Sequence, residues 1–377
     1  MINRARMADL VTELVQIDSH SKEERSVADR LAPMLRELGA EVRIDDAGAK
    51  VGADVGNIIA RVKGNRPDMA PLLLSAHMDT VPPGRGVKPV READRIRSDG
   101  TTILGGDDKS GLAVIVETLR VLRERSLPHG DIEVAFTICE EIGLLGAKHL
   151  DVDALAARWA IVLDSPTASS LFTRAPSQDH FEFVVHGLEA HAGVCPEQGI
   201  SAVKVAAQAI ACMPVGRVDA QTTSNVVIVE GGGPTNVVPN RCVVVGETRS
   251  LNDERLEAQN AAMRRCFQEA AAAARATVDG RERRAWIEER LDRTYERMDV
   301  PDDAPIVRRV LEAAKSVNHS VKTASIGGGS DANVFNRRGI QSVNLGTGMR
   351  AIHTVNEWID LQDFYACADT VLAACTM

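Results

Sequence analysis

The chain has 377 residues, of which 44% are hydrophobic and 26% are charged, and its formal net charge is −9. At about 150 residues per domain, this length predicts two or three folded domains, and the acidic balance argues against nucleic acid as a partner, because phosphate binding requires a basic face. No apolar run approaches the roughly 20 residues needed to cross a bilayer, so no membrane partner is expected.

The first part of the chain alternates between strand-like and helical patterns. Strands are predicted at residues 41–44, 57–62, 72–76, 132–139 and 159–163, and helices at 7–17, 25–38, 112–125 and 144–150. Such alternation predicts an α/β fold with a mixed, mostly parallel sheet flanked by helices.

The pattern changes after Arg174, where the order of elements becomes strand, helix, two strands, helix and strand. These elements are predicted at residues 181–186, 201–212, 225–230, 242–248, 253–277 and 284–298. Their order predicts a compact ferredoxin-like α+β domain. Helices predicted at 306–317 and 361–374, with short strand candidates between them, then return to the α/β pattern. We therefore predict a discontinuous larger domain, residues 1–174 and 299–377, with residues 175–298 inserted into it.

Three predicted strands run directly into a histidine or into carboxylates. The first ends at His77 and Asp79, the second at Glu140 and Glu141, and the third at Asp164. Ligands collect at the carboxyl ends of the strands of an open parallel sheet, so we predict one metal site there. His77 can bind a metal while Asp79, two residues on, accepts a hydrogen bond from the other ring nitrogen. Taken alone, this pair would also fit an ordinary strand-end histidine beside an acid.

Two pairs of adjacent carboxylates carry further chemistry. Asp107 and Asp108 follow two glycines and precede a predicted helix. Asp108 is typical of a helix N-cap, which leaves Asp107 free to bridge two cations. Glu140 and Glu141 would repel each other unless positive charge lies nearby. One can bind a metal while the other acts as general base on a metal-bound water, and a solvated surface pair is the alternative.

Asp164 and His353 are weak signals when taken singly, because either could be an ordinary strand-end or loop residue. The whole set is more specific, because three carboxylates and one hydroxide balance two divalent cations, and two neutral histidines complete the coordination. The predicted ligands are His77, Asp107, Glu141, Asp164 and His353. Zinc suits such mixed imidazole and carboxylate ligands, with cobalt or manganese as substitutes. The sequence therefore predicts two divalent metal ions per chain.

Five segments resemble, in the same order, the M20 family of metallopeptidases, and most closely its peptidase T-like members, the tripeptide aminopeptidases. They are SAHMDTV (75–81), LGGDDKSG (104–111), EEIGLLGAKHLD (140–151), HAGVCPEQGISA (191–202) and GGGSDAN (327–333). The resemblance extends over essentially the whole chain. It implies that Asp107 bridges two metal ions, and that His77 and Asp164 complete the coordination of one of them. Glu141 and His353 would complete the other site.

The same resemblance implies catalytic roles. Asp79 would orient His77, and Glu140 would be the general base that activates a water bridging the two metals. It also implies a cis peptide bond between Asp107 and Asp108.

Three residues of the inserted domain match family positions that contact substrate. His191 would polarise the scissile carbonyl, from its own or a neighbouring subunit, Arg249 would hold a substrate carboxylate and Asn236 would hydrogen-bond the substrate. Each could instead be an ordinary polar residue of a turn or strand end. The GGGSDAN segment differs from the GGTDG-type segment of true tripeptidases. The resemblance therefore specifies the metal chemistry more closely than the substrate.

Together these features predict metal-dependent hydrolysis of a peptide (amide) bond in short peptides, most simply by an aminopeptidase acting on di- and tripeptides. Residues 1–174 and 299–377 would form the catalytic domain, and residues 175–298 a lid or dimerisation domain. An amidohydrolase or deacylase acting on N-acyl amino acids, or a carboxypeptidase, needs the same metals and base, so these alternatives stay open. A binding protein that had lost the chemistry would show substitutions at the metal or base positions, and none is found.

The seven cysteines are scattered, odd in number and without a CxxC pair, which predicts free thiols in a reducing compartment. The N-terminal residues show no signal-peptide pattern, so a cytoplasmic location is expected. The edge strands of the inserted domain could pair between two copies of the chain, so a homodimer is an open expectation.

Overall fold

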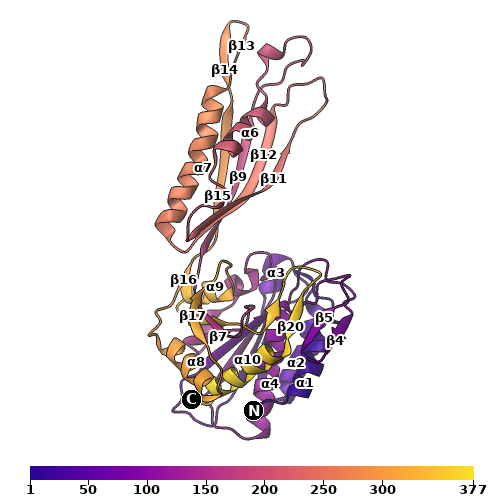
Figure 1. Ribbon diagram of the computed structural model, residues 1–377, viewed down its shortest axis with the longest axis vertical. Coiled ribbons are helices and arrows are strands. Elements are labelled where there is room, and N and C mark those ends of the chain that lie inside the picture. Colours follow the sequence, from indigo (N-terminus) through magenta and orange to yellow (C-terminus); the bar gives the residue numbers. More distant parts are fainter. The chain divides into compact units, whose positions relative to one another are not determined.

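The computed structural model describes residues 1–377, which divide into two compact units (Figure 1). The first unit comprises Met1–Ala175 and Met298–Met377, and the second comprises Pro176–Arg297. The second unit is therefore an insertion between two segments of the first. None of the helices combines the length and the apolar character that crossing a bilayer would require.

A nine-stranded sheet forms the centre of the first unit. Its strands, in spatial order, are β1 (Glu41–Ile44), β2 (Ile58–Val62), β6 (Ile132–Thr137), β3 (Leu72–His77), β7 (Trp159–Val162), β18 (Gln341–Leu345), β8 (Ser170–Ala175) and β16 (Met298–Asp299), and β17 (Lys322–Ser325) pairs with β8. The four central strands β6, β3, β7 and β18 are parallel, and antiparallel pairs join them to β2 and β8. The predicted α/β class with a mixed sheet is confirmed.

Helices pack on this sheet and on one another. They are α1 (Arg4–Leu14), α2 (Arg25–Glu37), α3 (Ala47–Val51), α4 (Gly106–Glu124), α5 (Leu145–His149), α8 (Pro305–Ser316), α9 (Asp331–Arg337) and α10 (Leu361–Cys375). Most side chains of α4 are buried, because β3, α1 and α10 all contact it. The buried Lys109 donates hydrogen bonds from Nζ to the carbonyl oxygens of Leu14 (3.1 Å) and Ile17 (2.9 Å). This contact ties the end of α1 to the start of α4.

A second, smaller sheet of the first unit joins distant parts of the chain. Its strands, in spatial order, are β19 (Met349–Arg350), β20 (Trp358–Asp360), β5 (Arg95–Ser98) and β4 (Pro89–Arg91). The sequence indicated short strands after residue 317 without bounds and gave no sign of β4 and β5, because two to four residues are too few to show a clear alternating period. Since β20 pairs with β5, residues 351–357 lie beside the segment that leads into α4.

The second unit is built on an antiparallel sheet. Its strands, in spatial order, are β10 (Gly216–Arg217), β11 (Thr222–Gly231), β12 (Arg241–Ser250), β9 (Ser177–His186) and β15 (Trp286–Tyr295). The helices α6 (Ala202–Cys212) and α7 (Asp253–Ala273) pack on each other, and both contact β12. Apart from the short β10 and a hairpin between α7 and β15, the chain order is the predicted βαββαβ order of a ferredoxin-like unit.

One part of the second unit differs from the sequence prediction. The helix α7 ends at Ala273, whereas the prediction extended it to residue 277. The following residues form a hairpin of β13 (Arg275–Val278) and β14 (Arg281–Arg284). Its two-residue turn is Asp279 and Gly280, both with positive φ. An Asp-Gly pair is a strong hairpin signal, so this turn could have been found in the sequence.

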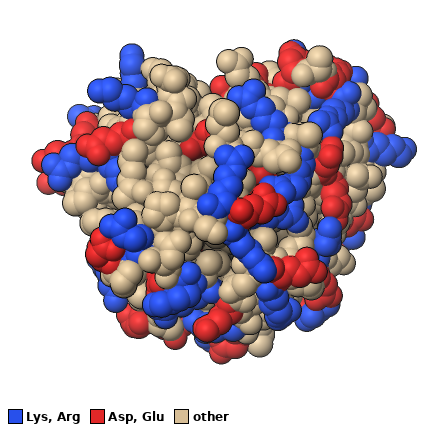
Figure 2. All heavy atoms as spheres, turned by 90° about the horizontal axis from the view of Figure 1, so that it is seen from below, with Lys and Arg blue, Asp and Glu red and all other residues tan.

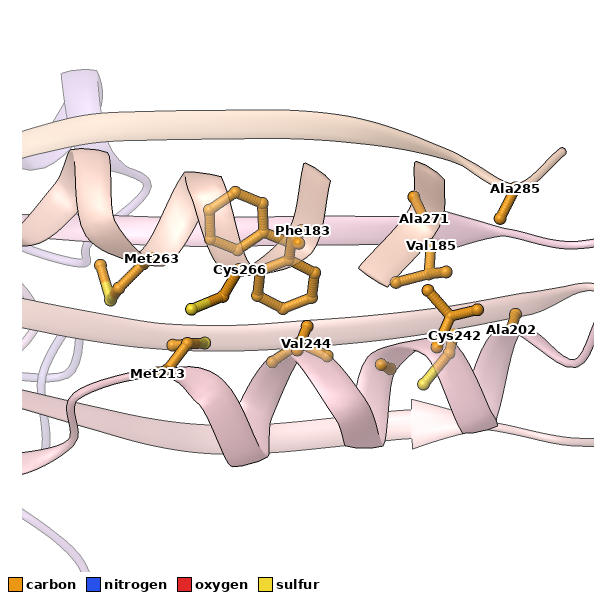
Figure 3. Close-up of a cluster of buried hydrophobic side chains, with 14 of the residues drawn as sticks. Phe183, Val185, Ala202, Met213, Cys242, Val244, Met263, Cys266, Ala271 and Ala285 are labelled. Carbon is orange, nitrogen blue, oxygen red and sulfur yellow. The ribbon is translucent and has the colours of Figure 1, made fainter. Parts of the chain in front are cut away.

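The core of the second unit lies between its sheet and its two helices. Phe181, Phe183 and Val185 alternate along β9 and are buried, because every second residue of a strand faces the same side. Figure 3 shows Phe183 and Val244 within this cluster, and the ring of Phe183 stacks on that of Phe267 with centroids 4.2 Å apart. This apolar layer gives the second unit a core of its own.

The same helices carry a disulfide between Cys212 and Cys266. The prediction of seven free thiols is wrong for these two residues, although Cys139, Cys195, Cys242, Cys367 and Cys375 are free. The two bonded residues are 54 positions apart, and only the packing of α6 on α7 brings their Cα atoms to 5.7 Å. Spacing in the sequence could not show this.

Charged side chains of both signs are interspersed on the face of the molecule shown in Figure 2. Exposed ion pairs are common in the chain, and that of Arg85 with Glu23 is an example. Such pairs contribute little to stability individually, about 0–1 kcal/mol each. Their main effect is on solubility.

Candidate metal centre

Three parallel strand ends bring the first candidate residues together. His77 is the last residue of β3, and β3 pairs in parallel with both β6 and β7. Glu140 and Glu141 follow the end of β6, and Asp164 follows the end of β7. The parallel register therefore places one histidine and three carboxylates at one edge of the sheet, where open α/β sheets bind ligands.

Asp107 lies at the centre of this cluster, because each of its carboxylate oxygens faces a different histidine. Oδ1 lies 3.1 Å from Nε2 of His77, and Oδ2 lies 3.2 Å from Nε2 of His353. Glu141 Oε1 lies 2.9 Å from the same nitrogen of His353. A carboxylate in this arrangement can bridge two cations, each of them beside one histidine.

Candidate ligand atoms that lie within 4.8 Å of one another form two groups that share Asp107. The groups are His77, Asp107 and Asp164, and Asp107, Glu141 and His353. A third group joins His77 to Glu140 and Glu141. The first two groups already use all five predicted ligands and leave Glu140 outside them. This grouping is the one that the resemblance implies, and the ligand roles themselves stay predictions.

The electrostatics of the cluster indicate a shortage of positive charge. Burial, together with repulsion from Glu140, raises the pKa of Asp164 well above its usual value, and burial likewise raises the pKa of Glu140. Burial also opposes ionisation of Asp107, but hydrogen bonds to His353 and His77 hold its pKa below the usual value. The hydrogen bond to Asp107 contributes most to raising the pKa of His353 to about 10. Two divalent cations would supply the missing charge, so the donor set fits the predicted pair.

Asp79 holds more than one part of the site. Nδ1 of His77 lies 2.9 Å from the carbonyl oxygen of Asp79 and 3.3 Å from its carboxylate Oδ1. The carboxylate also accepts hydrogen bonds from the amides of Glu140 (2.9 Å) and Glu141 (3.2 Å). A further hydrogen bond comes from the hydroxyl of Ser21, at 2.6 Å. Asp79 therefore positions both glutamates as well as the histidine, and sequence reasoning missed this link.

Asp108 has the capping role expected from the sequence. Its Oδ1 accepts a hydrogen bond from the amide of Gly111 at 3.0 Å, which caps the first regular turn of α4. Its Oδ2 accepts the amide of His77 at 3.2 Å, so the same side chain also holds the end of β3. The peptide bond between Asp107 and Asp108 is cis, as the resemblance implies.

Glu24 is another buried carboxylate that the sequence did not single out. Its Oε1 accepts the amide of Cys139 at 2.8 Å, immediately before Glu140. Cys139 has a positive φ of 51°, a conformation that a non-glycine residue rarely adopts. Burial, followed by repulsion from Asp79, raises the pKa of Glu24 to about 7. The contact helps to hold the turn that presents Glu140.

The three predicted substrate-contact residues lie in the second unit. His191 forms an isolated bridge with Val237, and the amide of Ala192 donates to the carbonyl oxygen of Asn236 at 2.9 Å. His191 and Asn236 are therefore carried by neighbouring segments. Arg249 lies on β12, where its guanidinium pairs with Glu247 at 2.8 and 3.0 Å. Contact of any of the three with a substrate stays a prediction.

Comparisons with known proteins cover nearly the whole chain. The model of a family described as Peptidase family M20/M25/M40 matches residues 73–376. The Bacillus subtilis protein YqjE, named as uncharacterized, is 40% identical over 374 residues, 99% of this chain and 98% of that protein. The crystal structure of aminopeptidase PepT from Bacillus cereus is 39% identical, with a TM-score of 0.89, and covers 100% of this chain and 98% of its own. That of a tripeptidase from Staphylococcus aureus is 35% identical, with a TM-score of 0.93 and the same coverage of both chains.

Proposed function

Because this chain belongs to the peptidase family M20/M25/M40, we propose that it is a metal-dependent aminopeptidase that hydrolyses di- and tripeptides. The observation that carries the proposal is the carboxylate of Asp107, whose two oxygens face two different histidines. The similar structures named as an aminopeptidase and as a tripeptidase support the choice of substrate.

We propose that the cofactor is a pair of zinc ions, with cobalt or manganese as substitutes. The residues that would hold the pair are His77, Asp107, Glu141, Asp164 and His353. When bound, two such cations lower the pKa of water towards neutrality and polarise the carbonyl group of a substrate. Five protein donors for two cations leave positions open for water and substrate.

Glu140 is the proposed general base. It would take a proton from water as the oxygen bonds to the carbonyl carbon, and would deliver that proton to the amine when the C–N bond breaks. Glu140 is only 8% exposed, and its backbone amide is held by Asp79, so its position is well defined. The second unit would add His191 as a donor to the oxyanion, and Arg249 and Asn236 as substrate contacts.

A panel of peptides tests this proposal. Free and N-acetylated di- and tripeptides would be incubated with the metal-free enzyme and with enzyme supplied with zinc, cobalt or manganese. We expect release of the N-terminal residue only from peptides with a free α-amine, and only when cations are present. Cleavage restricted to the N-acetylated peptides would instead identify a deacylase, and release of the C-terminal residue would identify a carboxypeptidase.

We also propose that the second unit joins two copies of the chain. On β11, the side chains of Val227, Ile228 and Val229 are 63%, 47% and 55% exposed. The short β10 pairs only with Thr223 and Ser224, so the rest of this edge has no neighbouring strand within the chain. Unpaired apolar edges of this kind pair readily with another copy.

Light scattering coupled to size-exclusion chromatography tests the dimer. We expect a dimer for the wild type and a monomer for Ile228→Lys, because a charge at the edge opposes strand pairing. A monomeric wild type would refute the proposed dimer and leave the proposed chemistry unaffected.

A further inference from the structure

Glu357 is a buried carboxylate that lies against the loop carrying Asp107. Its Oε2 accepts hydrogen bonds from the amides of Leu104 (2.8 Å) and Gly105 (2.7 Å). Its Oε1 accepts the amide of Asp107 itself, at 3.0 Å. Glu357 is only 1% exposed, so water does not compete for these contacts. Three amide hydrogen bonds to one buried carboxyl group hold the loop.

The same residue belongs to the segment that presents His353. Both lie between β19 and β20, and the amide of Glu357 donates to the carbonyl oxygen of Thr354 at 3.1 Å. The pairing of β20 with β5 begins at the next residue, Trp358, and anchors this end of the segment. One side chain therefore connects the backbone of Asp107 to the segment of His353, two residues that the chain separates widely.

There is little free space around this connection. A Cβ atom added at Gly106 would lie 3.0 Å from Cγ1 of Ile359 and 3.2 Å from Oε1 of Glu357. Both distances are tighter than ordinary van der Waals contact. A side chain at Gly106 would therefore press on Glu357 and Ile359, and the glycine lets the loop lie close enough for the three hydrogen bonds to Glu357.

We propose that Glu357 is a positioning residue that sets the separation of Asp107 from His353, and thereby the affinity for the cation that these two residues would share with Glu141. Glu357 is not a member of any candidate ligand group, so it acts through the backbone of Asp107. The inference rests on the proposed dinuclear centre. Partners that orient metal ligands typically change metal affinity or activity by about 10–100-fold when they are replaced.

The test is a cobalt titration of the metal-free Glu357→Gln variant and of the metal-free wild type. Calorimetry and visible absorption monitor the binding of cobalt. The glutamine has the same shape, but its amide group has one acceptor oxygen and would turn an NH₂ towards backbone donors. We expect one of the two cobalt ions to bind about 10–100-fold more weakly, with a changed absorption spectrum. The other ion would share Asp107 but not the segment of His353, so it should lose less affinity.

Glu133→Gln is the matched control. Glu133 is likewise buried, and its carboxylate accepts the amides of Ala156 (3.0 Å) and Ala157 (2.8 Å), in a loop without predicted ligands. We expect this variant to bind both cobalt ions with wild-type affinity. An equal loss of affinity in both variants would reveal a general structural effect and would overturn the proposal.

Two further outcomes separate the inference from the function on which it rests. Unchanged cobalt binding and absorption in Glu357→Gln would overturn the positioning role alone. A wild type that binds fewer than two cobalt ions would overturn the dinuclear centre. If the variant does not fold, hydrogen exchange of the metal-free wild type decides the question: slow exchange of residues 104–107 supports the proposal, and exchange as fast as in an exposed loop refutes it.

Discussion

The two units treat buried charge differently. In the second unit the buried carboxylate of Asp179 pairs with the guanidinium of Arg293 and accepts a hydrogen bond from Asn260 at 2.6 Å. In the first unit the carboxylates of Asp107 and Glu140 are buried among other carboxylates, with histidines as the nearest cationic groups. Asp179 is thus paired within the chain, whereas the crowded carboxylates of the first unit are the candidate ligands of the proposed cations.

This difference indicates which part of each unit carries chemistry and which part stabilises the fold. Buried charges that are left without a partner are costly, and proteins retain them chiefly where the chemistry requires them. The crowding of carboxylates in the first unit therefore marks a site, and the apolar core of the second marks a support. Changes at the carboxylates of the first unit should alter cation binding and turnover, and changes in the apolar core of the second unit should alter its stability.

The largest effect is expected from Asp107→Asn. The substitution removes a charge and replaces one of the two oxygens with an NH₂ group that cannot bind a cation, so hydrolysis should be abolished and fewer than two cations should remain bound. Metal analysis after reconstitution and a peptide assay would measure both. Asp9→Asn, at an exposed ion pair with Arg91, is the control and should change neither. Retention of two cations by Asp107→Asn would refute the bridge.

Glu140→Gln should separate turnover from cation binding. We expect the turnover number to fall by about 10²–10⁴-fold, the usual contribution of a general base, while two cations stay bound. Steady-state kinetics and metal analysis of the same preparation test this. Loss of a cation from the variant would show that Glu140 is a ligand and that the base is another group.

Phe267→Ala tests the role of the apolar core of the second unit. Phe267 is fully buried and stacks on Phe183 at 4.2 Å, so its truncation should cost about 3–5 kcal/mol of the stability of the second unit. Urea unfolding, with hydrogen exchange of residues 177–186 as the local probe, measures the loss. Cobalt affinity should not change. A parallel fall in cobalt affinity would mean that the two units do not act independently.

The smallest effect is expected from Cys212→Ser, which removes the disulfide to Cys266. Opening a crosslink between residues 54 positions apart should cost about 2–4 kcal/mol, chiefly by releasing the unfolded chain. Urea unfolding should show this loss, and a reducing agent should destabilise the wild type but not the variant. If the reducing agent has no effect on the wild type, the crosslink is absent in solution.

Long, periodic elements were the most predictable part of the fold. The helix predicted at 25–38 is observed as Arg25–Glu37, and the helix predicted at 361–374 is observed as Leu361–Cys375. Their apolar spacing is a local property, which a sequence shows directly. The bounds and partners of the short strands β19 and β20 were not predicted, because these strands exist only through pairing with each other and with the distant β5.

The candidate site likewise has features that the sequence could predict and features that it could not. Which side chains could bind cations was predictable, because His77, Glu141 and Asp164 all follow apolar strands and have the chemistry of metal ligands. The contacts that position them were not predictable. The hydrogen bond from Leu104 to Glu357 spans 253 positions, and no local pattern indicates which acid will accept it.

By itself, the sequence determined the kind of fold and the kinds of donor atoms, since both depend on residue types at short spacing. Only the tertiary structure decided that the two oxygens of Asp107 face His77 and His353, and that Cys212 reaches Cys266. The physical reason is that such distances are set by how whole elements pack. Packing sums many weak contacts between residues that lie far apart in the chain.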